Sequence, residues 1–260
     1  MSAAGRWWTL RPEEARPRLA QLGFRDEDVE TLAKHFLDSE GRGNLGHGLS
    51  RIEWLESWEQ LDPRPRPRRV ESTEGYERWD GDGALGYLTL EAVVQAQLQD
   101  PPAHARLVVC ARTFPTGALG YWVRRLADAG HVALLTATSP RRLAHPDGGE
   151  PLTGTNPLAI AIPSSDGAPV VADVSMSAVT HGDVLAGRAR PEELVPFGGP
   201  QAHKAFALAV GLQLLVDALV PEEGHGAVLL VARPEADPVP AFRALAAGMR
   251  LPGDIQNSLM

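Results

Sequence analysis

His47 lies between two glycines in the segment Gly-His-Gly-Leu-Ser-Arg at residues 46–51. Flanking glycines leave an imidazole accessible and let a ligand approach the backbone closely. An imidazole exchanges a proton near neutral pH, and Arg51, one helical turn further on, can bind a carboxylate through two parallel hydrogen bonds. The segment therefore predicts an acid/base residue beside a carboxylate-binding residue. A helix-capping loop in which both side chains are incidental is the alternative that the same spacing allows.

Asp173 is a second candidate, because it lies near the end of the apolar run at residues 168–174. A carboxylate among strand residues is costly unless it is paired or functional. Such an acid could orient or polarise an imidazole. A capping residue at the end of a strand is the alternative interpretation.

Two further segments carry groups that could bind an anion. His203 and Lys204 begin the apolar segment 202–219, shortly after a glycine pair, and a helix N-terminus with a lysine attracts phosphate. Only two of the 25 basic residues are lysines, which draws attention to Lys204. The turn Gly-Thr-Asn-Pro at 154–157 presents hydrogen-bonding side chains ahead of a predicted strand. Lys204 could equally do no more than solubilise the start of a buried helix.

The overall composition excludes several classes of protein. A net charge of −8 argues against general binding to nucleic acid or to an anionic membrane. The single cysteine, Cys110, excludes an intramolecular disulfide and a cysteine-rich zinc module, and we expect no metal site. No apolar run approaches the roughly 20 residues that span a bilayer, and the first residues lack the apolar core of a secretory signal. We expect a soluble, cytoplasmic protein that acts on a small molecule.

The pattern of apolar residues predicts an α/β fold with helices at both ends and a sheet in the middle. Helical spacing covers residues 10–36, 88–99, 120–129, 202–219 and 239–249, and His35 is expected at the surface of the first region. Short apolar runs predict strands at 107–110, 132–136, 158–162, 170–174 and 228–231. The alternating prolines and arginines within 61–82 indicate an extended, solvated linker. No glycine-rich turn of the Rossmann type joins a strand to a helix.

Taken in order, these segments resemble the type-2 malate/L-lactate dehydrogenase family. That family also contains ureidoglycolate, sulfolactate and 2,3-diketogulonate oxidoreductases and reductases of cyclic imino acids. Its G-T-N-P-L-A-I-A-I-P motif is present letter for letter at 154–163. Its S-H-G-x-x-R, D-G-x-x-x-x-G, V-L-D-x-x-x-S, P-L-G-G-H-K-G and x-P-G motifs are similar to segments at 46–51, 80–86, 171–177, 196–205 and 251–253.

The resemblance implies a non-Rossmann α/β fold and a homodimer. It implies an N-terminal helical region with a linker at 1–80, a nicotinamide-binding sheet domain at 81–197, and a C-terminal helical region at 198–260 that packs against the N-terminal part. It also implies hydride transfer between NADPH or NADH and the C2 carbon of a 2-oxo acid or cyclic imine.

Site residues follow from the resemblance by position. His47 would be the acid/base and Asp173 its partner, which would raise the pKa of His47 above its ordinary value of about 6.5. Arg51 would bind the substrate carboxylate, and Pro115 would lie in the substrate pocket. The residues that would line the cofactor are Thr136, Thr138, Ser139, Pro140, Gly154, Thr155, Asn156, Pro157, His203 and Lys204.

The chain departs from the family pattern at several of these places. Pro115 stands where the family has a histidine, Gly46 replaces a serine, and Ala205 replaces a glycine. The segment between Asp173 and His203 is also short. Two functions therefore remain open. One is a diverged reductase, and the other is a non-redox descendant that binds a ligand or performs acid/base chemistry without a cofactor.

Overall fold

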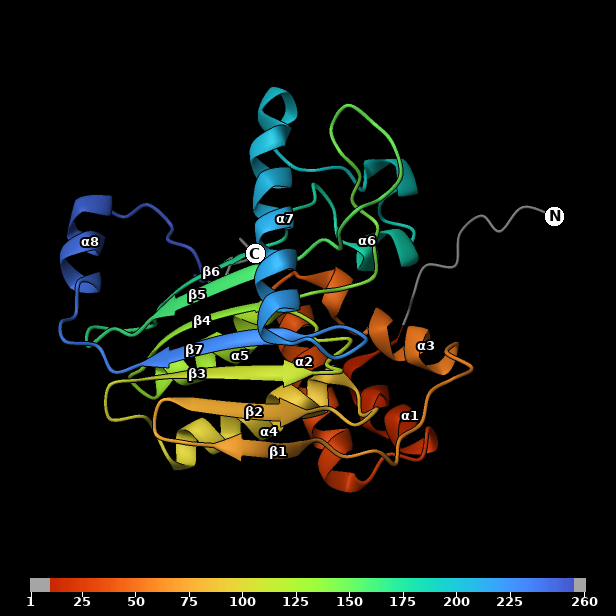
Figure 1. The fold of residues 1–260 in the computed structure, drawn as a ribbon, viewed down its shortest axis with the longest axis horizontal. Coiled ribbons are helices and arrows are strands. Elements are labelled where there is room, and N and C mark those ends of the chain that lie inside the picture. The colour runs from red at the N-terminus through yellow and green to blue at the C-terminus, as the bar shows by residue number, and fades with distance from the viewer. Residues whose placement is uncertain (1–9, 255–260) are drawn as a thin grey trace.

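Seven strands form one open sheet in the computed structural model, which describes residues 10–254 (Figure 1). The strand order is β1-β2-β3-β7-β4-β5-β6. Only β2 and β3 are parallel, and every other neighbouring pair is antiparallel. The strands are β1 Arg68–Ser72, β2 Tyr76–Asp80, β3 Ala105–Ala111, β4 Val132–Ala137, β5 Leu158–Ile162, β6 Val170–Val174 and β7 Ala227–Ala232.

The sheet takes strands from all three ranges into which the sequence was divided. β7, from the C-terminal range, pairs with β3 on one side and β4 on the other, so the chain's last strand lies in the middle of the sheet. Its run of small and branched apolar residues suits a strand covered on both faces. β1 and β2 lie within the segment predicted as a solvated linker. That prediction was wrong for β2, whose Glu77 and Trp79 are buried, whereas β1 is exposed throughout.

The helices predicted at both ends of the chain are present, and further helices lie between them. The first and last residues of these helices differ from the predicted positions by a few residues, as helix ends commonly do. The α-helices are α1 Ala15–Gln21, α2 Asp26–Gly41, α3 Ser50–Glu56, α4 Gly86–Gln99, α5 Leu119–Asp128, α6 His181–Leu185, α7 Ala202–Leu219 and α8 Val239–Ala246. Short 3₁₀ turns are η1 Pro12–Glu14, η2 Leu45–His47, η3 Pro191–Glu193 and η4 Gly199–Gln201.

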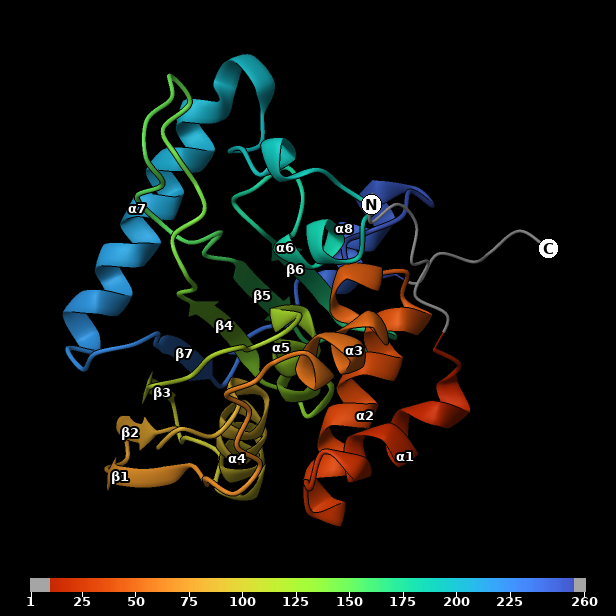
Figure 2. The same cartoon turned by 90° about the vertical axis from the view of Figure 1, so that its right-hand side faces the viewer.

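Helices cover the two faces of the sheet unequally. On one face α5 packs on β4, β5 and β6, α4 packs on β2, and α1, α2 and α3 lie outside them (Figure 2). This side holds the main core, with Trp122, Tyr87 and Leu135 fully buried. On the other face α7 contacts β4 and β7, and a smaller cluster joins Val216 of α7 to Val109 of β3.

α7 is the most apolar helix of the described chain. By length and composition alone, Gly199–Leu219 is long and apolar enough to cross a membrane, although no such run was expected from the sequence. A helix that packs on a sheet passes the same test. One side of α7 is buried on the sheet through Ala209 and Val216, and the other side leaves Leu208 and Leu214 exposed.

Candidate active site

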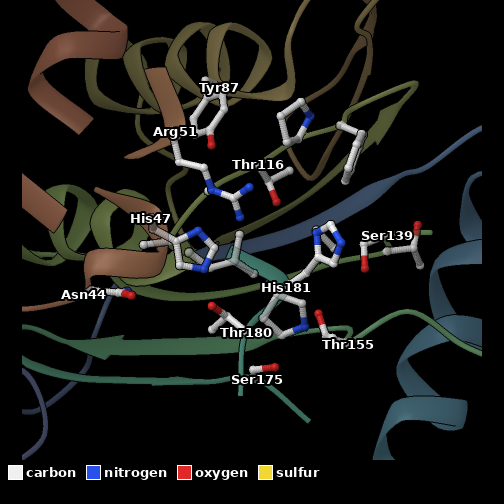
Figure 3. Close-up of a pocket in the computed structure, with 18 of the residues that line it drawn as sticks. Asn44, His47, Arg51, Tyr87, Thr116, Ser139, Thr155, Ser175, Thr180 and His181 are labelled. Atoms are coloured by element: carbon white, nitrogen blue, oxygen red, sulfur yellow. The ribbon is translucent and has the colours of Figure 1, made fainter. Parts of the chain in front are cut away.

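A cavity of about 470 Å³ lies where η2, α3 and α6 meet the ends of β4, β5 and β6 (Figure 3). Its size suits a small ligand or one end of a dinucleotide. It collects segments that are far apart in the chain. Its lining residues are Asn44, His47, Arg51, Trp54, Trp58, Tyr87, Phe114 to Leu119, Ala137, Thr138, Ser139, Arg142, Thr155, Pro157, Asp173, Ser175, Thr180 and His181.

The two glycines that flank His47 allow η2 to pack closely against its neighbours. A Cβ on Gly48 would overlap the carboxylate of Glu40 in α2, and Glu40 accepts a hydrogen bond from the Leu49 N–H at 2.9 Å. A Cβ on Gly46 would lie 2.5 Å from the Thr180 hydroxyl, beside α6. Glycine on both sides therefore lets η2 lie close to α2 and α6 while the His47 ring faces the cavity (Figure 3).

His47 is a neutral imidazole at neutral pH. Burial first, and then the charge of Arg51, lower the pKa of His47 to about 3, against a smaller opposing effect of Asp183. Its Nδ1 is buried and has no hydrogen-bond partner among residues 10–254. The direction is opposite to the predicted rise, because desolvation and a neighbouring cation both disfavour the imidazolium.

Asp173 lines the same cavity, but it forms no hydrogen bond with His47 among the interactions of the described residues. Its Oδ2 accepts a hydrogen bond from the Gly120 N–H at the start of α5, at 2.8 Å. Although Asp173 remains accessible from the cavity, the protein around it keeps bulk water away and raises the pKa of its carboxyl, and the Gly120 N–H opposes this rise. The acid whose charge reaches His47 is Asp183, so the partnership between Asp173 and His47 stays a prediction.

Arg51 is the cation of the cavity wall beside His47. Its exposed fraction is 9%, its Nε donates to the Gly46 carbonyl at 2.8 Å, and its guanidinium lies 5.2 Å from the ring centre of Trp54. Among residues 10–254 it forms no ion pair with any carboxylate. Because an unpaired buried charge is costly, this guanidinium is arranged to receive an anion from outside.

The loop that carries Pro115 forms another part of the wall. Pro115 is buried and lines the cavity, and its place in a substrate pocket stays a prediction. Behind this loop, His35 is fully buried, which corrects the expected surface position. Its Nε2 accepts a hydrogen bond from the Ala118 N–H at 3.1 Å, and its ring stacks on Trp122 with ring centres 5.1 Å apart. A helical spacing cannot distinguish such a histidine from an exposed one.

Four of the residues predicted to line the cofactor also line the cavity: Thr138, Ser139, Thr155 and Pro157. The other members of these two segments support them from behind. Thr136 donates from its hydroxyl to the Pro157 carbonyl at 2.9 Å, and the buried Asn156 amide donates to the Ala209 carbonyl of α7 at 3.0 Å. Pro140 and Gly154 are not among the lining residues.

His203 and Lys204 lie elsewhere. Both are exposed on the first turn of α7, and neither lines the cavity. The structure therefore brings eight of the predicted site residues together around the cavity, without these two. Their contact with a cofactor stays a prediction.

The sequence model of the malate/L-lactate dehydrogenase family matches residues 13–196, well over half of the chain. The chain belongs to this family. Among curated relatives, a Δ1-pyrroline-2-carboxylate/Δ1-piperideine-2-carboxylate reductase of Pseudomonas putida is 29% identical over 229 residues, covering 76% of this chain and 65% of the relative. Hydroxycarboxylate dehydrogenase B of Escherichia coli is 24% identical, covering 62% and 46% respectively. The chain thus spans about half to two thirds of the length of such relatives.

Solved structures show the same fold. A Δ1-piperideine-2-carboxylate reductase from Pseudomonas syringae superposes with a TM-score of 0.80 at 23% identity, covering 94% of this chain and 89% of that one. A sulfolactate dehydrogenase from Methanocaldococcus jannaschii gives 0.71 at 19%, covering 92% and 82%. The predicted α/β, non-Rossmann fold of the malate/L-lactate dehydrogenase family is therefore confirmed.

Sequence reasoning missed several cavity residues of this malate/L-lactate dehydrogenase family member. Tyr87 is fully buried, and its hydroxyl, which points toward Arg51 in Figure 3, has no hydrogen-bond partner within residues 10–254. Arg142 and His181 line the wall formed by the long β4–β5 connection and by α6. The glycine in D-G-x-x-x-x-G could have drawn attention to Tyr87, which follows it, but Arg142 carried no local signal.

Proposed function

We propose that this chain is an NAD(P)H-dependent oxidoreductase that reduces the C=O or C=N carbon next to the carboxylate of a 2-oxo acid or cyclic imine. The observation that supports this most is Arg51, a nearly buried guanidinium without an ion pair among residues 10–254, in the same cavity as the unpartnered imidazole of His47. Relatives with reductase and dehydrogenase names support the same class of reaction.

Each of the two residues has a distinct task in this proposal. Arg51 binds the substrate carboxylate, which fixes the neighbouring C2 carbon near His47. As C2 receives a hydride, the electron pair of the double bond moves to the oxygen or nitrogen, and that atom takes a proton from His47. General acid help of this kind contributes about 10²–10⁴-fold to a rate.

Binding of the substrate prepares His47 for this task. The charge of Arg51 helps to keep His47 neutral. A carboxylate paired with Arg51 cancels that charge, so the pKa of His47 rises and the ring can take up the proton that reduction consumes. In the oxidative direction the neutral ring is already in the form of a base.

The wall opposite Arg51 fits the reacting end of a nicotinamide cofactor. The hydroxyls of Ser139 and Thr155 face the cavity, and both can accept or donate hydrogen bonds. Thr138 and Pro157 complete this wall. Bound NADH or NADPH would supply the hydride.

A second candidate function is a non-redox descendant of the same scaffold. It is favoured by one observation, namely that His203 and Lys204, both predicted to line the cofactor, are exposed and lie outside the cavity. Such a protein would bind an anionic ligand through Arg51 without any dinucleotide.

Titration of the purified protein with NADH and NADPH, followed by nicotinamide fluorescence, separates the two candidates. The reductase is expected to bind one of them below millimolar concentration and to oxidise it when a 2-oxo acid or cyclic imine is added. An Arg51→Gln variant should retain cofactor binding and lose most substrate affinity. A protein that binds neither nucleotide at millimolar concentration is not a reductase.

We further propose a cytoplasmic homodimer. The large apolar side chains that remain exposed on α7 and on and after α8 support this assembly, because a monomer rarely leaves extended apolar surface in water. They are Leu208, Leu214 and Leu215 on α7, Phe242 and Leu245 on α8, and Met249 just after it.

A further inference from the structure

The cavity contains a second arginine that has no anionic partner. Arg142 lines it on the long connection between β4 and β5, and among residues 10–254 it forms no ion pair. A guanidinium has five N–H donors. The Arg142 guanidinium donates a long hydrogen bond of 3.5 Å to the Pro140 carbonyl. Most of its N–H donors therefore remain free for a ligand.

The backbone holds Arg142 in place. Its N–H donates to the Thr153 carbonyl at 2.8 Å, in the short antiparallel bridge that closes the connection. The next residue, Leu143, is fully buried against Met176 and Ala209. Arg141, directly before it, is exposed and does not line the cavity. The segment therefore presents Arg142 to the cavity on a main chain held by hydrogen bonds. It leaves the adjacent Arg141 in solvent.

His181 is the group next to Arg142 that shares this part of the cavity. Burial, followed by the charges of Arg142 and Arg51, lowers the pKa of His181 to about 4. The charge of Arg142 acts on it more strongly than that of Arg51. In the view of Figure 3, His181 lies toward Ser139 and Thr155, whereas Arg51 and His47 lie on the other side.

The charges that face the cavity do not balance. Among its lining residues Arg51 and Arg142 are cations, and Asp173 is the one carboxylate. Asp173 already accepts a hydrogen bond from Gly120 and has a raised pKa. One bound carboxylate on Arg51 would leave Arg142 unneutralised, in a chain whose net charge is −8.

We propose that Arg142 and His181 form a second anion-binding subsite, which receives a distal carboxylate of the substrate while Arg51 holds the carboxylate next to the reacting carbon. The substrate is then a dianionic 2-oxo acid or imine. The choice of reaction rests on the function proposed above, but the subsite itself does not.

A phosphate of the cofactor is the other anion that could reach Arg142. The geometry favours the substrate, because Arg142 and His181 line the same cavity as Arg51 and His47. The two guanidiniums thus act within one small cavity of about 470 Å³, which has room for the reacting end of a dinucleotide but not for its whole length.

Binding of unreactive anions tests the subsite without cofactor or turnover. Trp54 and Trp58 line the cavity, so their fluorescence reports occupancy. Malonate, succinate, glutarate and adipate are each compared with the monocarboxylate of equal carbon number. In the wild type, at least one dicarboxylate should bind about tenfold or more tightly than its monocarboxylate counterpart, the scale of one charge-assisted contact.

Three variants locate the source of that preference. Arg142→Gln should reduce it to about twofold or less, Arg142→Lys should restore part of it, and Arg141→Gln is the matched control that should leave it unchanged. His181→Gln should weaken dicarboxylates more than monocarboxylates. A wild type without any preference, or an unchanged preference in Arg142→Gln, overturns the proposal.

A separate titration distinguishes the cofactor. If Arg142→Gln weakens NADH or NADPH binding and leaves dicarboxylate binding unchanged, the guanidinium belongs to a cofactor phosphate and the proposal is overturned. If the protein binds no nicotinamide nucleotide but shows an Arg142-dependent preference for a dicarboxylate, the subsite stands and the proposed reductase activity fails.

Discussion

At the scale of single residues, the chemistry of this protein depends on buried groups without partners. Arg51 has no ion pair, and the Nδ1 of His47 and the hydroxyl of Tyr87 have no hydrogen-bond partner within residues 10–254. Unsatisfied buried groups are costly in a folded protein, and they persist where a ligand satisfies them. Their concentration around one cavity is therefore the strongest functional signal in the molecule.

His47→Gln tests the proposed proton transfer. Glutamine keeps a polar side chain of similar size but cannot exchange a proton, so kcat for reduction should fall by about 10²–10⁴-fold. Substrate and cofactor affinities should change little, because Arg51 remains. Steady-state kinetics and a fluorescence titration measure both. An unchanged kcat would show that another residue donates the proton.

The low pKa of His47 predicts proton uptake when an anion binds. Arg51 lowers this pKa and Asp183 raises it, and the ring of the buried His35 also interacts with His47. Oxamate, an unreactive isostere of pyruvate, would neutralise Arg51 and raise the pKa of His47, so the bound state holds more protons than the free state. Uptake should increase as the pH falls from 7 toward 5.

Calorimetry of oxamate binding in buffers of different ionisation enthalpy measures this uptake. His47→Gln should reduce it, and the remainder should come from His181, whose pKa is lowered to about 4 by burial and by the charges of Arg142 and Arg51. Proton release, or the same uptake in His47→Gln, would contradict the assignment.

At the scale of elements, the cavity depends on tight contacts between α2, α4 and the loop that carries Pro115. Gly117 in this loop has φ +71°, and a Cβ there would overlap the His35 ring and lie against Tyr87. A Cβ on Gly86, at the start of α4, would lie 2.6 Å from the Pro115 carbonyl. The position of this part of the cavity wall is therefore fixed by close contacts with α2 and α4 behind it.

Gly117→Ala should lower the free energy of unfolding by about 2–4 kcal/mol, because a strained backbone adds to overpacking against His35. Gly130→Ala is the matched control, since Gly130 has φ +90° but open space around its Cβ position. It should cost about 1 kcal/mol. Urea unfolding measures both, and equal losses would mean that contact with His35 does not constrain this loop.

At the scale of the whole molecule, α7 and α8 leave large apolar side chains exposed. α7 covers part of the sheet beside Leu230, which remains 38% exposed, and Phe242 and Leu245 of α8 are 56% and 80% exposed. Figure 1 shows α7 over the middle of the sheet and α8 apart from it, both away from α1 and α3. This distribution favours burial against a second copy of the chain.

Sedimentation at micromolar concentration should give about 56 kDa, twice the chain mass of 27.9 kDa. Leu214→Glu on α7 should shift the protein toward the monomer, because a charge in a closely packed apolar interface is left without a partner. Val70→Glu is the control, since Val70 is equally exposed but lies on the edge strand β1. A wild-type monomer, or dissociation in the control alone, would contradict the dimer.

The sequence by itself determined the features that depend on neighbours in the chain. Five of the seven strands and the longer helices followed from local periodicity, because apolar spacing reflects which face of an element is buried, whereas β1, β2, α3 and α6 did not. His47 and Arg51 were identified together because both lie on one short segment, one helical turn apart. The motif around residues 154–163 located the wall that holds Thr155 and Pro157.

Only the tertiary structure decided the electrostatics of the cavity. Arg142 and His181 lie far from His47 in the chain, and they meet it because the sheet places the β4–β5 connection and α6 beside η2. The burial of His35 and the lowered pKa of His47 likewise depend on distant segments that exclude water. Desolvation is a property of three-dimensional surroundings, so the spacing of residues along a chain carries neither its size nor its sign.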